Sequence, residues 1–261
     1  RQMCIRDRAY AKIEDLIFGN AAGVIATTEG CRKLYLGRYP EFEVDRFRVI
    51  SNGYDPAVFA STGSRARTDS TNGLVLLHSG VLYPHERDPT EFFHALRALK
   101  LRNAFDGLRL EFRFRGSGHD DHYRKIVEQF ELQEIVRFVP RLPYVKAAEE
   151  MLGADALMIF QASNCNLQIP AKLYEYLYSQ RPILGLTDPQ GDSGQLLLSL
   201  GVNSVAQLED PDSIEVVLET FLAQLRSGTA YTVPMAEVNR YSRQSLTKDL
   251  SDFLQQLLRS P

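Results

Sequence analysis

Residues 168–186 read Gln-Ile-Pro-Ala-Lys-Leu-Tyr-Glu-Tyr-Leu-Tyr-Ser-Gln-Arg-Pro-Ile-Leu-Gly-Leu. Pro170 suits the first position of a helix, because a missing N–H costs nothing there. Apolar side chains then recur at helical spacing, at Leu173, Tyr176 and Leu177. Apolar runs of the buried-strand type precede this helix at 156–160 and follow it at 182–186. The stretch therefore predicts a strand, a polar loop, a helix and a second strand.

The same alternation extends through residues 74–230. Strands are predicted at 74–78, 108–114, 135–139, 156–160, 182–186 and 204–205. Helices are predicted at 88–100, 119–132 and 144–152, from 170, near 193–200, and at 213–226. Strands and helices that alternate at this pitch predict an α/β fold, with a doubly wound parallel sheet of about six strands covered on both faces.

The two ends of the chain differ from this region. Residues 1–59 predict helices at 10–19 and 28–37 and strands at 23–27 and 47–50, and residues 60–73 are polar enough for an exposed linker. Residues 236–258 predict one long helix with an apolar stripe. We expect this helix, within a final region 231–261, to cross back onto residues 1–59.

The start and the composition set further expectations. The chain of 261 residues has no initiator methionine, and its first eight residues show no helical pattern, so we expect a fragment of a longer protein. Three scattered cysteines give neither a disulfide framework nor a metal spacing, and no apolar run could span a bilayer. A net charge of −3 argues against nucleic-acid binding. We expect a cytoplasmic protein without a bound metal or cofactor.

Candidate site residues follow the carboxyl ends of the predicted strands. In an open parallel sheet ligands bind at these ends, where helix N-termini attract phosphate. Lys172 and Glu175 lie early in the helix after Pro170, although solvated charges on an ordinary helix would look the same. Ser79 and Gly80 end the first strand. Arg87 follows them and suits a diphosphate, or equally an ion pair with a neighbouring carboxylate.

A glycine turn follows the second strand. Gly116, Ser117 and Gly118 would let the backbone approach a ligand, but a sharp turn capped by the acidic residues after it is the more economical interpretation. His119 and His122 are best explained as part of a solvated helix start. None of the five histidines shows a metal-binding pattern.

Several segments together resemble the family-4 retaining glycosyltransferases of the GT-B fold. The resemblance rests on 22–28, 49–55, 115–118, 154–156, 172–177 and 181–184, in the family's order. It implies two Rossmann-like domains, of which residues 74–230 would bind the nucleotide-sugar donor and residues 1–59 would be the tail of the acceptor domain. Asn52 and Gly53 would mark the hinge.

The resemblance also implies roles for single residues. Glu175 matches the second glutamate of the family's E-x7-E motif, which holds the donor ribose. The first glutamate would fall at Leu167, and Gln168 beside it could substitute, followed by Ile169 and Pro170. The family's arginine after the first glycine falls at Val81, which leaves Arg87 and Lys172 as cations for the diphosphate. The nucleobase loop would comprise Val139, Arg141 and Leu142.

The resemblance implies transfer of a hexose from a UDP- or GDP-sugar to an unknown glycan or lipid-linked acceptor. The donor would be a substrate, so that neither cofactor nor metal is required, and the missing domain could bring the protein to a membrane surface. A fragment without most of the acceptor domain is expected to be inactive. Two other functions stay open: a non-catalytic nucleotide-sugar-binding module, and a nucleotide-sugar 2-epimerase, although no acid/base group supports the latter.

Overall fold

The larger part of the chain is built on six strands. The structure, a computed structural model, describes residues 5–60, 73–105 and 107–259. The strands are β3 (Leu74–Ser79), β4 (Leu110–Arg115), β5 (Val136–Val139), β6 (Ala156–Gln161), β7 (Ile183–Thr187) and β8 (Val205–Ala206). All neighbours pair in parallel, in the order β5-β4-β3-β6-β7-β8. The predicted α/β fold with a parallel sheet is confirmed, and its order reverses between β3 and β6.

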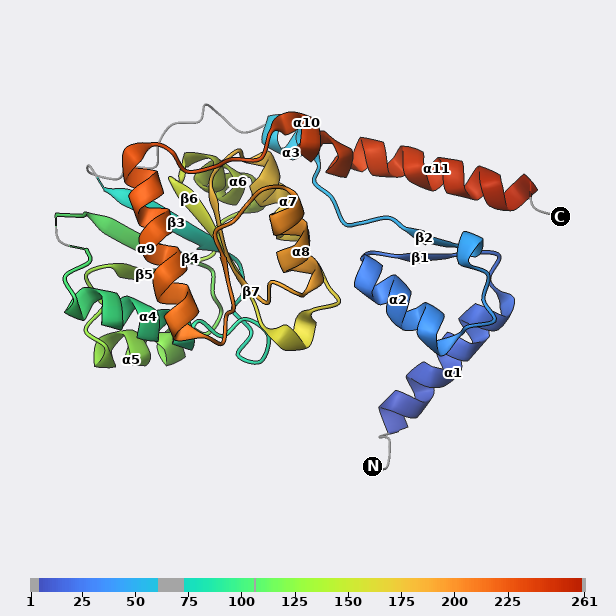
Figure 1. Cartoon of the computed structure of the whole chain (residues 1–261), viewed down its shortest axis with the longest axis horizontal. Coiled ribbons are helices and arrows are strands. Elements are labelled where there is room, and N and C mark those ends of the chain that lie inside the picture. Colours follow the sequence, from blue (N-terminus) through green and yellow to red (C-terminus); the bar gives the residue numbers. More distant parts are fainter. Residues whose placement is uncertain (1–4, 61–72, 106, 260–261) are drawn as a thin grey trace.

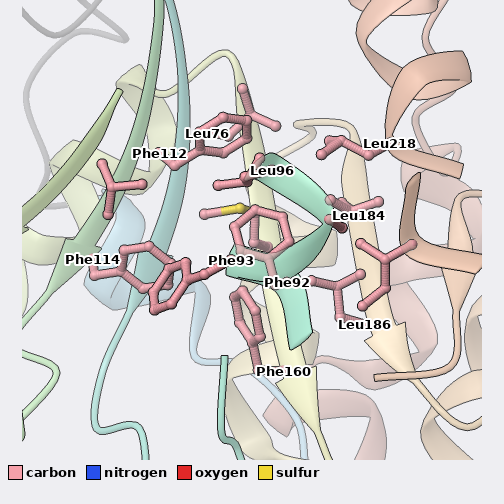
Figure 2. Packing of buried hydrophobic residues seen from close by; sticks show 14 of the residues in the cluster. Leu76, Phe92, Phe93, Leu96, Phe112, Phe114, Phe160, Leu184, Leu186 and Leu218 are labelled. Carbon is pink, nitrogen blue, oxygen red and sulfur yellow. The ribbon is translucent and has the colours of Figure 1, made fainter. Parts of the chain in front are cut away.

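Helices cover both faces of this sheet (Figure 1). One face carries α4 (Thr90–Leu101), α5 (Asp120–Gln129) and α9 (Pro211–Ser227). The other carries α6 (Tyr144–Gly153), α7 (Ala171–Tyr178) and α8 (Asp192–Ser199). Leu76 packs into the first core and Leu77 into the second, because successive side chains of a strand point to opposite faces. Aromatic rings dominate the first core, where Phe92, Phe112, Phe114 and Phe160 lie together (Figure 2).

A smaller unit is formed by the start of the chain and its last helix. It contains α1 (Ile5–Asn20), β1 (Val24–Ala26), α2 (Glu29–Arg38), a 3-10 turn (Val44–Arg46) and β2 (Phe47–Val49). The two strands pair in parallel. Phe18 stacks on Tyr39 at 4.1 Å between ring centroids, over buried Phe42 and Phe47. Helix α1 begins earlier than the predicted residue 10, so the absence of helical patterning in the first eight residues was misleading from Ile5 onward.

The last helix, α11 (Arg243–Arg259), packs on this smaller unit (Figure 1). A Cβ atom added to Gly23 would lie 2.6 Å from Leu257 and 2.9 Å from Phe253. Arg48 donates to Gln256 Oε1 at 3.1 Å, and its guanidinium lies 5.5 Å from the Phe253 ring centroid. Gly23 therefore lies directly against the apolar side chains of α11, and a larger residue there would require Leu257 and Phe253 to move.

Two chain segments run side by side between the units. Tyr54 and Ser242 form a parallel bridge, in which Tyr54 N–H donates to Tyr241 O and Arg243 N–H donates to Tyr54 O. Short elements flank the bridge: α3 (Pro56–Ala60), α10 (Met235–Val238) and a 3-10 turn (Asn239–Tyr241). The single helix predicted over 236–258 is thus wrong, because Ser242 takes extended backbone angles (φ −66°, ψ 144°) to pair with Tyr54.

The predicted linker 60–73 falls mostly outside the described residues, which resume at Gly73. In the ranges that the structure describes, no helix is long and apolar enough to cross a membrane.

Candidate functional site

The best-supported site is a cavity of about 300 Å³ at the carboxyl ends of β3 and β4. Seven of the candidate residues line it: Ser79, Gly80, Gly116, Arg141, Leu142, Lys172 and Glu175. Five further residues complete the lining: Val81, Arg115, Tyr144, Ala147 and Met151. A second hollow of about 660 Å³ shares Val81, Gly116 and Arg141 with it and continues over Gly118 to the start of α5. The two cavities together are large enough for a nucleotide-sized ligand.

Lys172 and Gly80 meet at the floor of the 300 Å³ cavity. The Lys172 ammonium donates to the backbone oxygen of Ser79. Gly80 has φ +126°, a conformation that side chains disfavour, and a Cβ atom there would lie 2.1 Å from Lys172 Nζ. Only glycine at position 80 therefore allows the amine to occupy its place.

The charge of Lys172 is destabilised in this position. Burial lowers its pKa to about 8, the nearby Arg87 guanidinium contributes in the same direction, and Glu175 opposes both. The positive charges of Lys172 and Arg87 repel each other. A bound anion such as a diphosphate would offset this repulsion, so the pair favours an anionic ligand. Arg87 itself lies outside the cavity lining; its guanidinium stacks near the Tyr83 ring at 5.4 Å and donates to Val81 O at 3.4 Å.

The alternative interpretation of Arg87, an ion pair with Glu86 or Asp88, has no support among the described residues. The Asp88 carboxylate instead accepts from the N–H and hydroxyl of Thr90 and so stabilises the start of α4. The Arg87 guanidinium thus keeps donors for a ligand.

Glu175 has a partner that the sequence did not reveal. Its Oε1 accepts a hydrogen bond of 2.5 Å from the hydroxyl of Tyr144, the first residue of α6. Partial burial and this bond raise the pKa of the Tyr144 phenol. The carboxylate therefore faces the cavity with a fixed donor on one oxygen.

A buried ion pair shapes the wall next to Gly116. Arg115 donates to both oxygens of Glu150 at 2.7 Å each and to Pro140 O at 2.6 Å. Arg113 adds a bond of 3.1 Å to the same carboxylate, whose side chain is 7% exposed. Arg115 in this way ties the loop after β4 to the loop after β5. Gly116 allows the two loops to approach, since its Cβ would lie 3.3 Å from Arg141.

The remaining candidate residues lie elsewhere. Ser117 is fully buried and its hydroxyl donates to Asp120, as in the turn capped by acidic residues, while Gly118 lines only the second hollow. Val139 ends β5 without lining either cavity. Gln168, Ile169 and Pro170 also lie outside the lining. Pro170 precedes α7 with extended ψ 133°, so it caps the helix and the predicted first helical position is wrong by one residue.

The loop before α7 is attached to the smaller unit. Thr28 donates to Leu167 O at 2.9 Å, and Asn52 donates to Ile169 O at 3.3 Å. The Gly30 N–H donates to the Asp192 carboxylate at 3.2 Å. The first two contacts hold the loop that contains Gln168, and the third joins α2 to the start of α8.

His78 precedes Ser79 in β3. It is fully buried in β3, and its Nδ1 bonds Met158 O at 3.0 Å, so the backbone oxygen requires a proton on that nitrogen. Burial holds the pKa of His78 well below its usual range, and the Lys172 and Arg87 cations lower it further. His78 is therefore neutral at physiological pH.

Solved structures resemble this chain closely in fold and distantly in sequence. Sucrose-phosphate synthase from Thermosynechococcus elongatus superposes with a TM-score of 0.75 at 14% identity, over 100% of this chain and 64% of that one. Anabaena HepE in complex with UDP and glucose superposes with a TM-score of 0.71 at 14% identity, over 94% of this chain and 66% of that one. WaaG, a glycosyltransferase involved in lipopolysaccharide biosynthesis, superposes with a TM-score of 0.67 at 17% identity, over 92% of this chain and 68% of that one.

No protein-family model matches the sequence, and comparison with curated proteins gave no match. The chain spans 64% of the length of the sucrose-phosphate synthase structure. At identities of 14–17% the likeness establishes the fold alone. The chain has the Rossmann-like α/β fold of the solved GT-B glycosyltransferases.

Proposed function

We propose that this chain is the donor-binding part of a glycosyltransferase that transfers a hexose from a UDP- or GDP-sugar to a glycan or lipid-linked acceptor. The observation that carries the proposal is the meeting of Lys172, Glu175, Gly80 and Gly116 around one cavity at the carboxyl ends of the strands. HepE, one of the structures with this fold, was solved with UDP and with UDP-glucose. Membership of family 4 and retention of configuration belong to the same proposal.

The proposed chemistry is stabilisation of a leaving nucleoside diphosphate. Lys172 and Arg87 would bind the diphosphate, whose negative charge grows as the bond to the sugar breaks. The backbone at Gly80 and Gly116 can approach a phosphate closely because neither residue has a side chain. Glu175 would accept hydrogen bonds from the ribose hydroxyls. The proposal needs no metal ion, since two cations of the chain would neutralise the leaving group.

Calorimetric titration of UDP and GDP tests the donor site. A charged hydrogen bond of this kind contributes about 2–3 kcal/mol, so Glu175→Ala should weaken binding about a hundredfold. Glu219→Ala is the matched control, because Glu219 is exposed on α9, on the opposite side of the sheet. Equal affinities in the wild type and Glu175→Ala, or no binding of either nucleotide by the folded wild type, would refute the assignment.

A non-catalytic nucleotide-sugar-binding module is the second candidate. It is favoured by Leu167, which stands where the resemblance places the family's first glutamate, and whose backbone oxygen is occupied by Thr28. Hydrolysis or transfer of a UDP-sugar, assayed in the longer protein that the resemblance implies and compared with its Glu175→Ala variant, separates the two: a binding module would hold the donor without consuming it.

A further inference from the structure

A side-chain hydrogen bond joins Tyr144 in one helix to Glu175 in the next. Tyr144 begins α6 and Glu175 lies in α7, 31 residues later, yet the tyrosine Oη donates to the carboxylate Oε1 at 2.5 Å. Both residues line the cavity that also contains Lys172 and Gly80. A bond between distant segments at the wall of an open cavity restricts the orientation of the carboxylate there.

We propose that Tyr144 is a positioning residue, which holds the Glu175 carboxylate in the orientation that binds the ribose diol of a nucleotide. The inference rests on the proposed nucleotide-sugar site. It adds a residue to that site and predicts that the site selects ribonucleotides over 2′-deoxyribonucleotides.

The Glu175 carboxylate can accept hydrogen bonds from Tyr144 and from a ribose at the same time. An ionised carboxylate accepts about four hydrogen bonds on its two oxygens. Tyr144 uses one position on Oε1, so the remaining positions can accept from two adjacent ribose hydroxyls. Because the glutamate is already ordered by Tyr144, less side-chain freedom is lost when the nucleotide binds.

The tyrosine is suited to this role because it remains a donor. Partial burial and the bond to Glu175 raise the pKa of its phenol, so the hydroxyl keeps its proton at neutral pH. The residue is nevertheless 51% exposed, at the start of its helix. Removal of the hydroxyl alone should therefore leave the packing of α6 intact.

Calorimetry with UDP and GDP and their 2′-deoxy forms tests the role in the whole 261-residue chain. The wild type should prefer the ribonucleotide about tenfold, as expected for one hydrogen bond to a charged group. Tyr144→Phe should weaken ribonucleotide binding about fivefold and 2′-deoxynucleotide binding only about twofold, since the deoxy form keeps one of the two hydroxyls that Glu175 would bind. Tyr10→Phe, on exposed α1, is the control and should change neither affinity.

A double variant distinguishes positioning from a general structural effect. In the Glu175→Ala background, Tyr144→Phe should cause no further loss, because the residue acts through the missing carboxylate. Equal weakening of both nucleotide forms, or additive losses in the double variant, would overturn the role of Tyr144 and leave the donor site standing. If the folded wild type binds neither nucleotide, the donor site and the role of Tyr144 both fail.

Discussion

The Nζ atom of Lys172 in α7 donates a hydrogen bond to the backbone oxygen of Ser79, the last residue of β3. This contact joins the helix after β6 to the strand beside it, at the point where the strand order reverses. Ligands of doubly wound sheets bind at such a reversal. An ammonium group fixed at this point, beside the Gly80 backbone, is well placed for a phosphate of the ligand.

The first prediction concerns pH and the charge of Lys172. Its pKa of about 8 means that the free protein loses this proton as the pH rises through 8, whereas a bound diphosphate keeps the amine protonated. Binding then takes up a proton, and the UDP affinity should fall by up to about tenfold per pH unit above pH 8. Calorimetry between pH 7 and 9.5 measures this slope. Lys172→Arg stays charged and should show a smaller slope; identical slopes would contradict the assignment.

The second prediction concerns Gly80. Gly80→Ala places a Cβ atom 2.1 Å from Lys172 Nζ and forces alanine into φ +126°. We expect a loss of about 1–3 kcal/mol in the free energy of unfolding, together with weaker nucleotide binding, because the amine must move. Gly228→Ala is the control, since Gly228 also has positive φ but no atom within 4 Å of an added Cβ. It should lose stability and keep its nucleotide affinity. The idea fails if Gly80→Ala binds UDP as the wild type does.

The third prediction concerns the buried carboxylate of Glu150. Glu150→Gln removes the charge that Arg115 and Arg113 share; Arg113 keeps its ion pair with Glu111, whereas Arg115 loses its carboxylate partner. The free energy of unfolding should fall by about 3 kcal/mol in urea denaturation. The adjacent Glu149 forms an exposed pair with Lys146 at 2.7 Å, so Glu149→Gln should cost less than about 1 kcal/mol. Similar losses in both variants would show that the Arg115–Glu150 pair does not stabilise the fold.

The fourth prediction concerns acid stability. The folded pKa of His78 is lowered, so its protonation is harder in the folded than in the unfolded chain, and stability is lost as the pH falls from about 6.5 through the folded pKa. This residue should contribute a slope of up to about 1.4 kcal/mol per pH unit. Urea unfolding at pH 5 to 7 should show a smaller slope for His78→Asn, which can still donate to Met158 O. Parallel slopes in wild type and variant would argue against it.

The strands could be predicted because a buried strand appears in the sequence as a short continuous run of apolar residues. All six residues of β6 are buried and the first five are apolar, as expected for a strand covered on both faces. The same reasoning located Lys172 and Glu175, since parallel strands bring their carboxyl ends to one edge. The edge of the sheet that carries the candidate residues therefore followed from the order of elements alone.

Contacts between distant segments were not predictable in this way. Helical spacing runs through 236–258, but Ser242 leaves the helix for a bridge to Tyr54, and the neighbouring pair Arg243–Asp55 is separated by 188 residues. Two side-chain contacts of the site are similar cases. No sequence feature near Tyr144 identifies Glu175 as its partner, and none near Arg115 identifies Glu150. Periodicity reports which face is buried, and it does not report which polar group lies opposite.

The packing of α11 on the smaller unit has a consequence for the order in which the chain folds during synthesis. Arg48 contacts Gln256 across 208 residues, so β1 and β2 cannot pack against α11 until about 200 further residues have been synthesised. The six-stranded sheet and its helices, by contrast, emerge from the ribosome as one uninterrupted stretch and can fold as soon as β8 and α9 are available. Loop closure over such a span is slow relative to local contacts. During this interval the apolar surface that α11 later covers is open to chaperones.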